Sequence, residues 1–297
     1  MSMAKLFMYF IGLCNRVAAL FIAFSIVYGS AYCCTKGNIS SPPDIKRILD
    51  RGYLIVAMSS SERIPFFTAS DQGKEEPQGL DIDLAKEIAR NLGVEKVVFL
   101  RDTSSFNDVV NNVSNCKADM AISKISFTYN RATKVKYSKR YATLYKTLII
   151  NRTSFPEISN ITDDEIKSTF NDPKISIGVM QGTSYAAFAK LLFPKAQIIP
   201  MEKWEEIIEA VLSKKISAAF WDDLELEKYI DLNAGKYLFL KSLKFKEEKD
   251  TLHIIMPWDS HQLSNFIELF IASNDINYRT KDILPTLKKI RSKKGGG

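Results

Sequence analysis

Short apolar segments that suit buried strands alternate with amphipathic segments along most of this chain. The clearest pair is residues 54–58 (LIVAM), a β-branched run typical of a strand buried on both faces, followed by residues 80–92. In the latter, apolar residues recur every three or four positions, acidic residues stand near the start, and Gly93 follows the end. This spacing predicts a helix, and the alternation predicts the α/β fold class.

The alternation continues in both halves of the chain, and from Ile175 onward the second half repeats the strand, turn and helix order of the first. The expected strands are residues 97–100, 120–123, 175–180, 218–221 and 253–256, and the expected helices are residues 45–49, 106–113, 185–192, 204–212 and 260–270.

Length and composition limit the class of protein. A chain of 297 residues suits two lobes of ordinary domain size with a cleft between them. A hydrophobic fraction of 46% and a charged fraction of 25% are those of a globular protein, not of a disordered or multi-span membrane protein. The net charge is +7, but Lys and Arg are spread among acids without a basic helix or an aromatic RNA-binding pattern, so we expect no nucleic-acid partner.

The N-terminal stretch differs from the rest. Residues 17–27 (VAALFIAFSIV) carry no charge and have the length of a signal-peptide core, and Gly29 and Ala31 offer the small residues that a signal peptidase recognises. We therefore expect residues 1–31 to be a signal peptide and residues 32–42 a linker. The protein would then be exported to the periplasm or cell envelope.

Two alternatives for the leader remain open. Residues 6–27 together are long enough to span a membrane as an uncleaved anchor, although Asn15 and Arg16 would then lie in the apolar segment. Lipid attachment at Cys33 or Cys34 is disfavoured by the tyrosine that precedes them.

The remaining cysteines and the histidines do not indicate a metal site, a cofactor or a disulfide framework. Cys14 lies in the leader and Cys116 stands alone, while His253 and His261 are far from any cysteine pair. We expect no zinc site and no Cys/His nucleophile.

Five segments, in order and with matching spacing, resemble the family 3 extracellular solute-binding proteins, which are the amino-acid receptors of ABC importers. The resemblance covers almost everything after the leader. The segments are RGYLIVAMSSSERIPFF, GLDIDLAKEIARNLGV, FNDVVNNVSNCKADMAISKISFTYNRATKVKYSKRY, IGVMQGTSYAAF and SAAFWDD.

The resemblance implies the two-lobed type II periplasmic-binding-protein fold, in which each lobe is a mixed sheet flanked by helices and the chain crosses between lobes twice. The crossings near residues 148–151 and 252–255 would form the hinge that closes the lobes on a ligand. Lobe 1 would comprise residues 43–147 and 252–289, lobe 2 residues 148–251, and residues 290–297 a flexible tail.

The function implied is capture of an amino acid or similar small carboxylate by a monomer, which delivers it to the membrane subunits of an ABC importer. Arg131 matches the carboxylate-binding arginine of the family, and its planar guanidinium can bond both carboxylate oxygens. Thr183 matches a position that completes this site at a helix start, where unpaired amides favour an anion. The alternatives are a surface role for Arg131 and a simple N-cap for Thr183.

The other ligand contacts are implied by the same resemblance. Asp222 matches the acidic residue that holds the ligand's ammonium, with Asp223 as the adjacent alternative and helix capping as its competing role. Ser123 and Ser126 match positions around the ligand's α-groups. Phe106 matches an aromatic residue that packs on the ligand's side chain, although a core role is nearly as well supported.

Three positions depart from the family pattern. Ser60 stands where receptors for basic amino acids place an acid, and Arg63 stands where many members have a stacking aromatic residue. Lys124 replaces a residue that is usually small or polar. These changes disfavour Lys or Arg as the ligand, and they favour an acidic or polar ligand if Arg63 points into the cleft.

Two other functions compete with transport. Periplasmic dehydratases that act on prephenate-like or arogenate-like acids resemble the same fold, but they need a positioned general acid, and no residue is forced into that role, so we do not expect an enzyme. An anchored ligand-sensing domain would fit an uncleaved leader and would need a separate signalling chain.

Overall fold

The computed structural model describes residues 41–68, 77–232, 235 and 238–294. The expected signal peptide or anchor and most of the linker lie outside the described residues. Among the helices that the structure describes, none is both long and apolar enough to cross a membrane.

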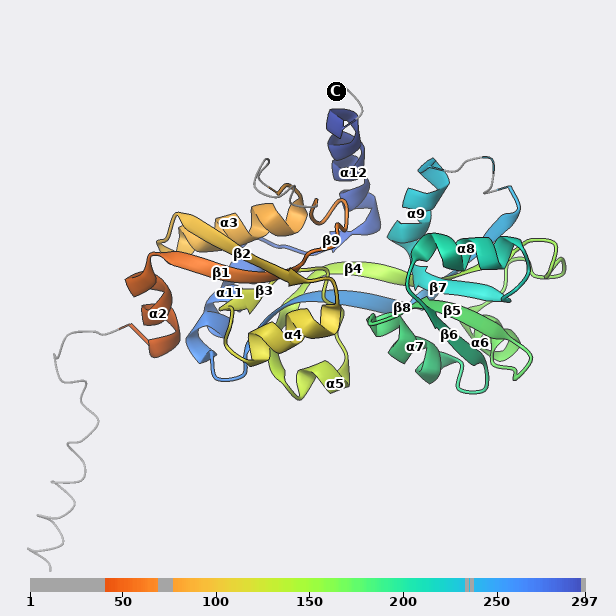
Figure 1. Ribbon diagram of the computed structural model, residues 1–297, viewed down its shortest axis with the longest axis horizontal. Helices are drawn as coiled ribbons and strands as arrows, with labels where there is room; N and C mark the ends of the chain where they lie inside the picture. Colours follow the sequence, from red (N-terminus) through yellow and green to blue (C-terminus); the bar gives the residue numbers. More distant parts are fainter. Residues whose placement is uncertain (1–40, 69–76, 233–234, 236–237, 295–297) are drawn as a thin grey trace, which may run out of the picture. The chain divides into compact units, whose positions relative to one another are not determined.

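The strands form one mixed sheet in the order β2-β1-β3-β8-β4-β7-β5-β6, with β9 paired to β4 (Figure 1). Pairing is parallel within the first strand group, β1 to β3, and within the second strand group, β5 to β7. The long strands β4 and β8 run antiparallel beside each other and join the groups. The bounds are β1 Tyr53–Ser59, β2 Lys96–Thr103, β3 Met120–Ala121, β4 Val135–Asn151, β5 Ser176–Met180, β6 Gln197–Met201, β7 Ala218–Asp222, β8 Leu240–Pro257 and β9 Tyr278–Arg279.

Helices cover both faces of the sheet, with α3 and α4 on opposite faces of the first strand group and α8 and α7 on opposite faces of the second (Figure 1). The predicted α/β class, with a mixed sheet, flanking helices and two crossings, is confirmed. The bounds are α2 Pro43–Arg51, α3 Leu80–Leu92, α4 Phe106–Ser114, α5 Tyr129–Ala132, α6 Asp163–Phe170, α7 Ser184–Leu192, α8 Trp204–Leu212, α9 Asp223–Leu232, α11 His261–Ser273 and α12 Thr280–Lys294.

The predicted helices and strands are all present, and α3 shows why the pattern was informative. Of its apolar residues, Ile82 and Ile88 are fully buried in a core that also holds residues of β1, and Gly93 ends the helix in the left-handed conformation. Burying an aliphatic side chain of this size stabilises the fold by about 1.5–3 kcal/mol. Each strand group has such a core on both of its faces.

The structure locates the crossings between the strand groups along β4 and β8. Residues 146–150 of β4 already pair with β7 of the second strand group, while Leu144 packs in the core of the first. On β8, Phe245 packs in a core of the second strand group and Leu252 in a core of the first. The chain therefore crosses near Tyr145 and between Phe245 and Leu252, so our expected hinge segments each lie just beyond a crossing.

The C-terminal expectation is wrong in one respect. We expected a flexible tail from residue 290 onward, but residues 290–294 belong to α12, and Ile290 packs against Leu287 and Ile64. The apolar spacing of Ile283, Leu287 and Ile290 is helical, and it extends the helix past the point where we ended lobe 1. Residues 295–297 lie outside the described part of the chain.

Candidate functional site

A small cavity lies between residues of the two strand groups. The space open to the centre of a water molecule is about 20 Å³, which is room for about one water. Of the predicted site residues, Phe106, Ser126, Arg131, Thr183 and Asp222 line this cavity. Lys124, Ser184, Tyr185, Trp221 and Asp250 line it as well.

Arg131 is buried at the cavity wall. It lies on the short helix α5, whose start is capped by Thr128, and its side chain is held by two neighbours. Nε and Nη2 donate to Asn107 Oδ1 at 3.3 and 3.1 Å, and Nη1 donates to the Ser126 carbonyl at 3.3 Å. Each terminal nitrogen has a second N–H, so the guanidinium can still take a carboxylate through two bonds. The predicted surface alternative for Arg131 does not fit this burial.

Thr183 is the N-cap residue of α7, but its side chain does not cap the helix. Its hydroxyl instead donates to the Met180 carbonyl at 2.7 Å, across the turn in which Gly182 adopts a φ of +72°. The amides at the start of α7 therefore donate no hydrogen bond to this hydroxyl. They begin a nine-residue helix beside the cavity, where an anion is favoured.

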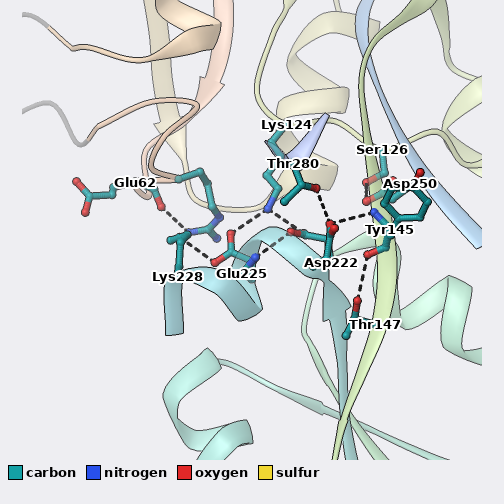
Figure 2. Close-up of polar contacts among 12 residues, drawn as sticks. Glu62, Lys124, Ser126, Tyr145, Thr147, Asp222, Glu225, Lys228, Asp250 and Thr280 are labelled. Atoms are coloured by element: carbon teal, nitrogen blue, oxygen red, sulfur yellow. Dashed lines mark hydrogen bonds and ion pairs between the residues drawn. The ribbon is translucent and has the colours of Figure 1, made fainter. Parts of the chain in front are cut away.

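Asp222 faces the cavity and is already paired with Lys124 (Figure 2). The Lys124 ammonium lies 2.9 Å from Asp222 Oδ2 and 2.9 Å from Glu225 Oε1, and Lys228 lies 2.8 Å from Glu225 Oε2. Asp222 Oδ1 also accepts the Glu225 amide at 3.1 Å, so the helix-capping role is realised too. We call this group of four residues the ionic cluster.

Burial and charge act against each other in the ionic cluster. Burial raises the pKa of Asp222 to about 6, although the Lys124 charge favours its ionised form. Burial also opposes the charge of Glu225, but Lys124 and Lys228 together hold the pKa of Glu225 well below its usual range. Lys124, although buried, has a raised pKa because Asp222 and Glu225 stabilise its charge. Lys124 is therefore a permanent cation at neutral pH.

The backbone of Lys124 is in the left-handed region, with φ of +51°. A non-glycine residue pays about 1–2 kcal/mol for this conformation. The Lys124 amide donates to Asp81 Oδ2 at 2.9 Å, and the other Asp81 oxygen accepts the Tyr141 hydroxyl at 3.0 Å. Sequence comparison marked Lys124 only as a departure, whereas the structure shows it reaching from the end of β3 to the start of α9.

Asp223, the alternative to Asp222, is not at the cavity. Its carboxylate accepts the Tyr145 amide at 3.1 Å, the Thr280 hydroxyl at 2.8 Å and the Lys244 ammonium at 2.6 Å. It therefore ties α9 to β4 and α12. Between the two adjacent acids, Asp222 is the one that faces the cavity.

Three predicted site residues do not line the cavity. Ser123 is buried and its hydroxyl accepts the Ser59 amide at 2.9 Å. Ser60 is exposed, and its amide donates to Thr103. The Arg63 guanidinium lies over the Phe106 ring, 5.4 Å from its centroid, and so approaches the cavity only through Phe106. Their direct roles in ligand binding stay predictions.

Asp250 is a cavity residue that sequence reasoning missed. It lies on β8 where this strand crosses between the strand groups, is 1% exposed, and accepts the Ser126 hydroxyl at 3.0 Å through Oδ2. Oδ1 has no hydrogen-bond partner among the described residues. Burial raises the pKa of Asp250. Its sequence context, KEEKD, is typical of a solvent-exposed charged segment, so the sequence did not indicate that Asp250 is a site residue.

Three other buried polar atoms of cavity residues also lack a hydrogen-bond partner within the described part of the chain: the Tyr185 hydroxyl, the Trp221 indole nitrogen and Asp222 Oδ2. Asp222 Oδ2 lies 2.9 Å from the Lys124 ammonium as an ion pair, without hydrogen-bond geometry. Tyr185 lies near enough to Asp250 to favour its charge, although without hydrogen-bond geometry. Buried polar groups are normally paired, so these atoms indicate a place where a polar ligand or water binds. No group of three potential metal-ligating side chains occurs in the described residues.

Residues 54–272 match the bacterial extracellular solute-binding proteins, family 3. The chain belongs to this family. The match covers the sheet from β1 to β8 and all of the residues that line the cavity. The predicted resemblance is thus confirmed.

Relatives with known names include binding proteins and an enzyme. The ABC transporter glutamine-binding protein GlnH of Bacillus subtilis is 24% identical over 228 residues, which are 74% of this chain and 78% of that protein. The membrane-bound lytic murein transglycosylase F of Serratia proteamaculans is 25% identical over 191 residues, 61% of this chain. This chain spans 35% of the length of that transglycosylase, and 45% of a probable ABC transporter extracellular-binding protein of Bacillus subtilis.

Solved structures share the fold. An ancestral amino acid-binding protein, a precursor of cyclohexadienyl dehydratase, has a TM-score of 0.61 at 24% identity and covers 84% of this chain and 97% of its own. The amino acid ABC transporter substrate-binding protein AbpA of Streptococcus pneumoniae, bound to L-arginine, has a TM-score of 0.62 at 23% identity and covers 82% of this chain and 96% of its own.

Proposed function

We propose that this protein is exported, captures an amino acid or similar small carboxylate between its two strand groups, and delivers it to an ABC importer. The observation that carries the proposal is the buried Arg131 at the wall of a cavity that the start of α7 also lines. A fixed guanidinium and a helix N-terminus at one small cavity favour a carboxylate. The glutamine-binding relative supports the ligand class, and the family supports an extracellular location.

A binding role is favoured over catalysis. Among the described residues, the carboxylates at the cavity are Asp222, which pairs with Lys124, and Asp250, whose Oδ2 accepts the Ser126 hydroxyl and whose Oδ1 has no hydrogen-bond partner. A general acid must be placed to transfer its proton to a substrate. The alternative function is that of a dehydratase, because one solved structure with this fold is a precursor of cyclohexadienyl dehydratase, and turnover of prephenate or arogenate would support it.

The test is a thermal-shift screen of the twenty amino acids and small dicarboxylates, followed by calorimetry on the best ligand. A ligand that binds only the folded protein raises Tm. Arg131→Ala should lower the affinity at least about 100-fold, because the ligand's carboxylate loses a buried charged partner that is worth about 3–5 kcal/mol. Arg90→Ala, an exposed change at the end of α3, is the control and should bind like the wild type. Equal affinity in the Arg131 variant would contradict the proposal.

A further inference from the structure

In the part of the chain that the structure describes, four charged side chains line the cavity: Lys124, Arg131, Asp222 and Asp250. Lys124 belongs to the ionic cluster, in which its charge and that of Lys228 balance the charges of Asp222 and Glu225. Arg131 and Asp250 remain, and neither forms an ion pair with another described residue within the salt-bridge distance of 4.0 Å. The cavity therefore presents one cation and one anion to a ligand.

The ionic cluster changes what Asp222 can do. Its Oδ1 accepts the Glu225 amide and its Oδ2 faces the Lys124 ammonium. A ligand ammonium at Oδ2 would lie within a few ångströms of the Lys124 ammonium, in a buried site where like charges repel strongly. The side chain of Lys124 thus occupies the position at which alignment predicted the ligand's ammonium.

Asp250 has what an ammonium needs. Asp250 lines the cavity, and one of its oxygens is buried and lacks a hydrogen-bond partner among the described residues. The Tyr185 hydroxyl, a second acceptor without a partner in that part of the chain, lines the same space. An ammonium carries three donors, so it can bond both of these oxygens and satisfy atoms that are otherwise buried without partners.

We propose that Asp250 accepts the ligand's ammonium while Arg131 binds its carboxylate, and that Lys124 has turned Asp222 from a ligand contact into a structural partner. The inference rests on the proposed function and assigns the ligand class more narrowly. The ligand is a zwitterion with an α-ammonium, and an acid that lacks this ammonium is a poor substitute.

The test compares two variants and two ligands by calorimetry on the full chain. The ligands are the amino acid that binds most tightly among the twenty and its 2-hydroxy acid, which keeps the carboxylate and side chain but has no ammonium. The wild type should prefer the amino acid by about 10- to 100-fold, the usual effect of losing a charged hydrogen bond in a buried site. Asp250→Asn should remove most of this preference, with little change in affinity for the 2-hydroxy acid.

Asp222→Asn is the matched comparison. It should lower Tm because Lys124 loses a partner, and it should weaken amino-acid binding less than about fivefold, a smaller loss than Asp250→Asn causes. Asn at position 250 can still accept the Ser126 hydroxyl, so we expect the variant to fold. If it does not, the wild-type preference for the amino acid over the 2-hydroxy acid tests the proposal alone, and equal affinity overturns it.

The outcomes separate this inference from the proposed function. Binding that depends on Arg131 but is lost in Asp222→Asn and kept in Asp250→Asn overturns the inference and leaves the function standing. If a dicarboxylate binds and none of the twenty amino acids binds, the inference is likewise overturned and the proposed function stands. No Arg131-dependent binding of any carboxylate overturns both.

Discussion

Lys124 keeps a backbone conformation that lysine ordinarily avoids, and the residues that hold it there are acids. Asp81 accepts its amide, while Asp222 and Glu225 take its ammonium. These three contacts are buried, so each is stronger than it would be at the surface. The strain of about 1–2 kcal/mol is thus offset by these contacts, of which the two ion pairs need a long cationic side chain at this position.

Asp81 makes folding stability depend on pH. Burial raises its pKa from 3.8 to about 7, so the folded protein keeps a proton that the unfolded chain releases. This contribution is fully present below about pH 4 and is lost as pH rises to about 7, with a slope of up to about 1.4 kcal/mol per pH unit. Asp81→Asn should flatten that decline, measured as free energy of urea unfolding from pH 4.5 to 7.5.

Asp83→Asn is the control for this pH effect, because Asp83 is exposed on the same turn of α3. It should keep the wild-type slope. A wild-type slope in Asp81→Asn would show that the Asp81 carboxyl titrates at its ordinary pKa in the folded protein. Asp222, whose pKa burial raises to about 6, adds a smaller decline that both variants retain.

The residues of the site divide by how their partners are encoded. Arg131, Thr183 and Phe106 could be predicted because they stand in local motifs of matching order. Asp250 and Lys124 could not, because their partners are far away in sequence: Ser126 contacts Asp250 and Glu225 contacts Lys124, each separated by more than a hundred residues. Periodicity carries no information about such pairs.

Elements could be predicted where an apolar period is unbroken. The pattern located α3 and α8 to the residue, since each buries one regular face. It missed β6, all of β4 and most of β8. In β4 and β8, KYSKRY and KFKEEKD place charged residues on strands that are partly exposed. Their pairing, rather than their own hydrophobicity, makes them strands.

The start of α3 requires a glycine at position 79, because there is no space for a Cβ atom there. Gly79 has a φ of +134°, and a Cβ there would collide with the backbone carbonyl of Phe66, which also accepts the Asp81 amide. Gly79→Ala should therefore lower the free energy of unfolding by about 3 kcal/mol or more, because backbone must move. Chemical denaturation would measure this loss.

Gly52→Ala is the matched comparison for Gly79→Ala. Gly52 also has a positive φ, +76°, but open space surrounds the position of a Cβ. Its loss should be about 1 kcal/mol, the cost of the left-handed backbone alone. Equal losses at the two glycines would mean that contact with Phe66 contributes nothing.

At the scale of the whole molecule, the ionic cluster joins the two strand groups without a ligand. Lys124 follows β3 of the first group, whereas Asp222 is the last residue of β7 in the second and Glu225 lies on the following helix, α9. Leu224, between these two acids, packs in the same core as Leu54 and Ile82. The groups are thus held together by both charge and apolar contact.

Lys124→Met should weaken the contact between the two strand groups in the ligand-free protein. It leaves Asp222 buried without its cation, which costs about 3 kcal/mol of folding stability, and it should increase the radius of gyration of the ligand-free protein. Small-angle X-ray scattering with and without ligand would measure the change. Lys228→Met leaves Lys124 in place and should keep the wild-type radius of gyration. A wild-type radius of gyration in Lys124→Met would mean that the ionic cluster does not hold the strand groups together.

The two crossings also set an order in time. The second strand group is built from neighbours in the chain, with Ile177 paired to Ala218, whereas Ala121 of the first group pairs with Ile255. Closing a longer loop is slower, so the middle of the chain completes its sheet first. The first strand group, although it is synthesised earlier, cannot complete its sheet until β8 has been synthesised, because β3 pairs with β8. In a chain exported as we propose, this delay leaves the first strand group incompletely folded until synthesis is nearly complete. An incompletely folded segment is easier to translocate across a membrane.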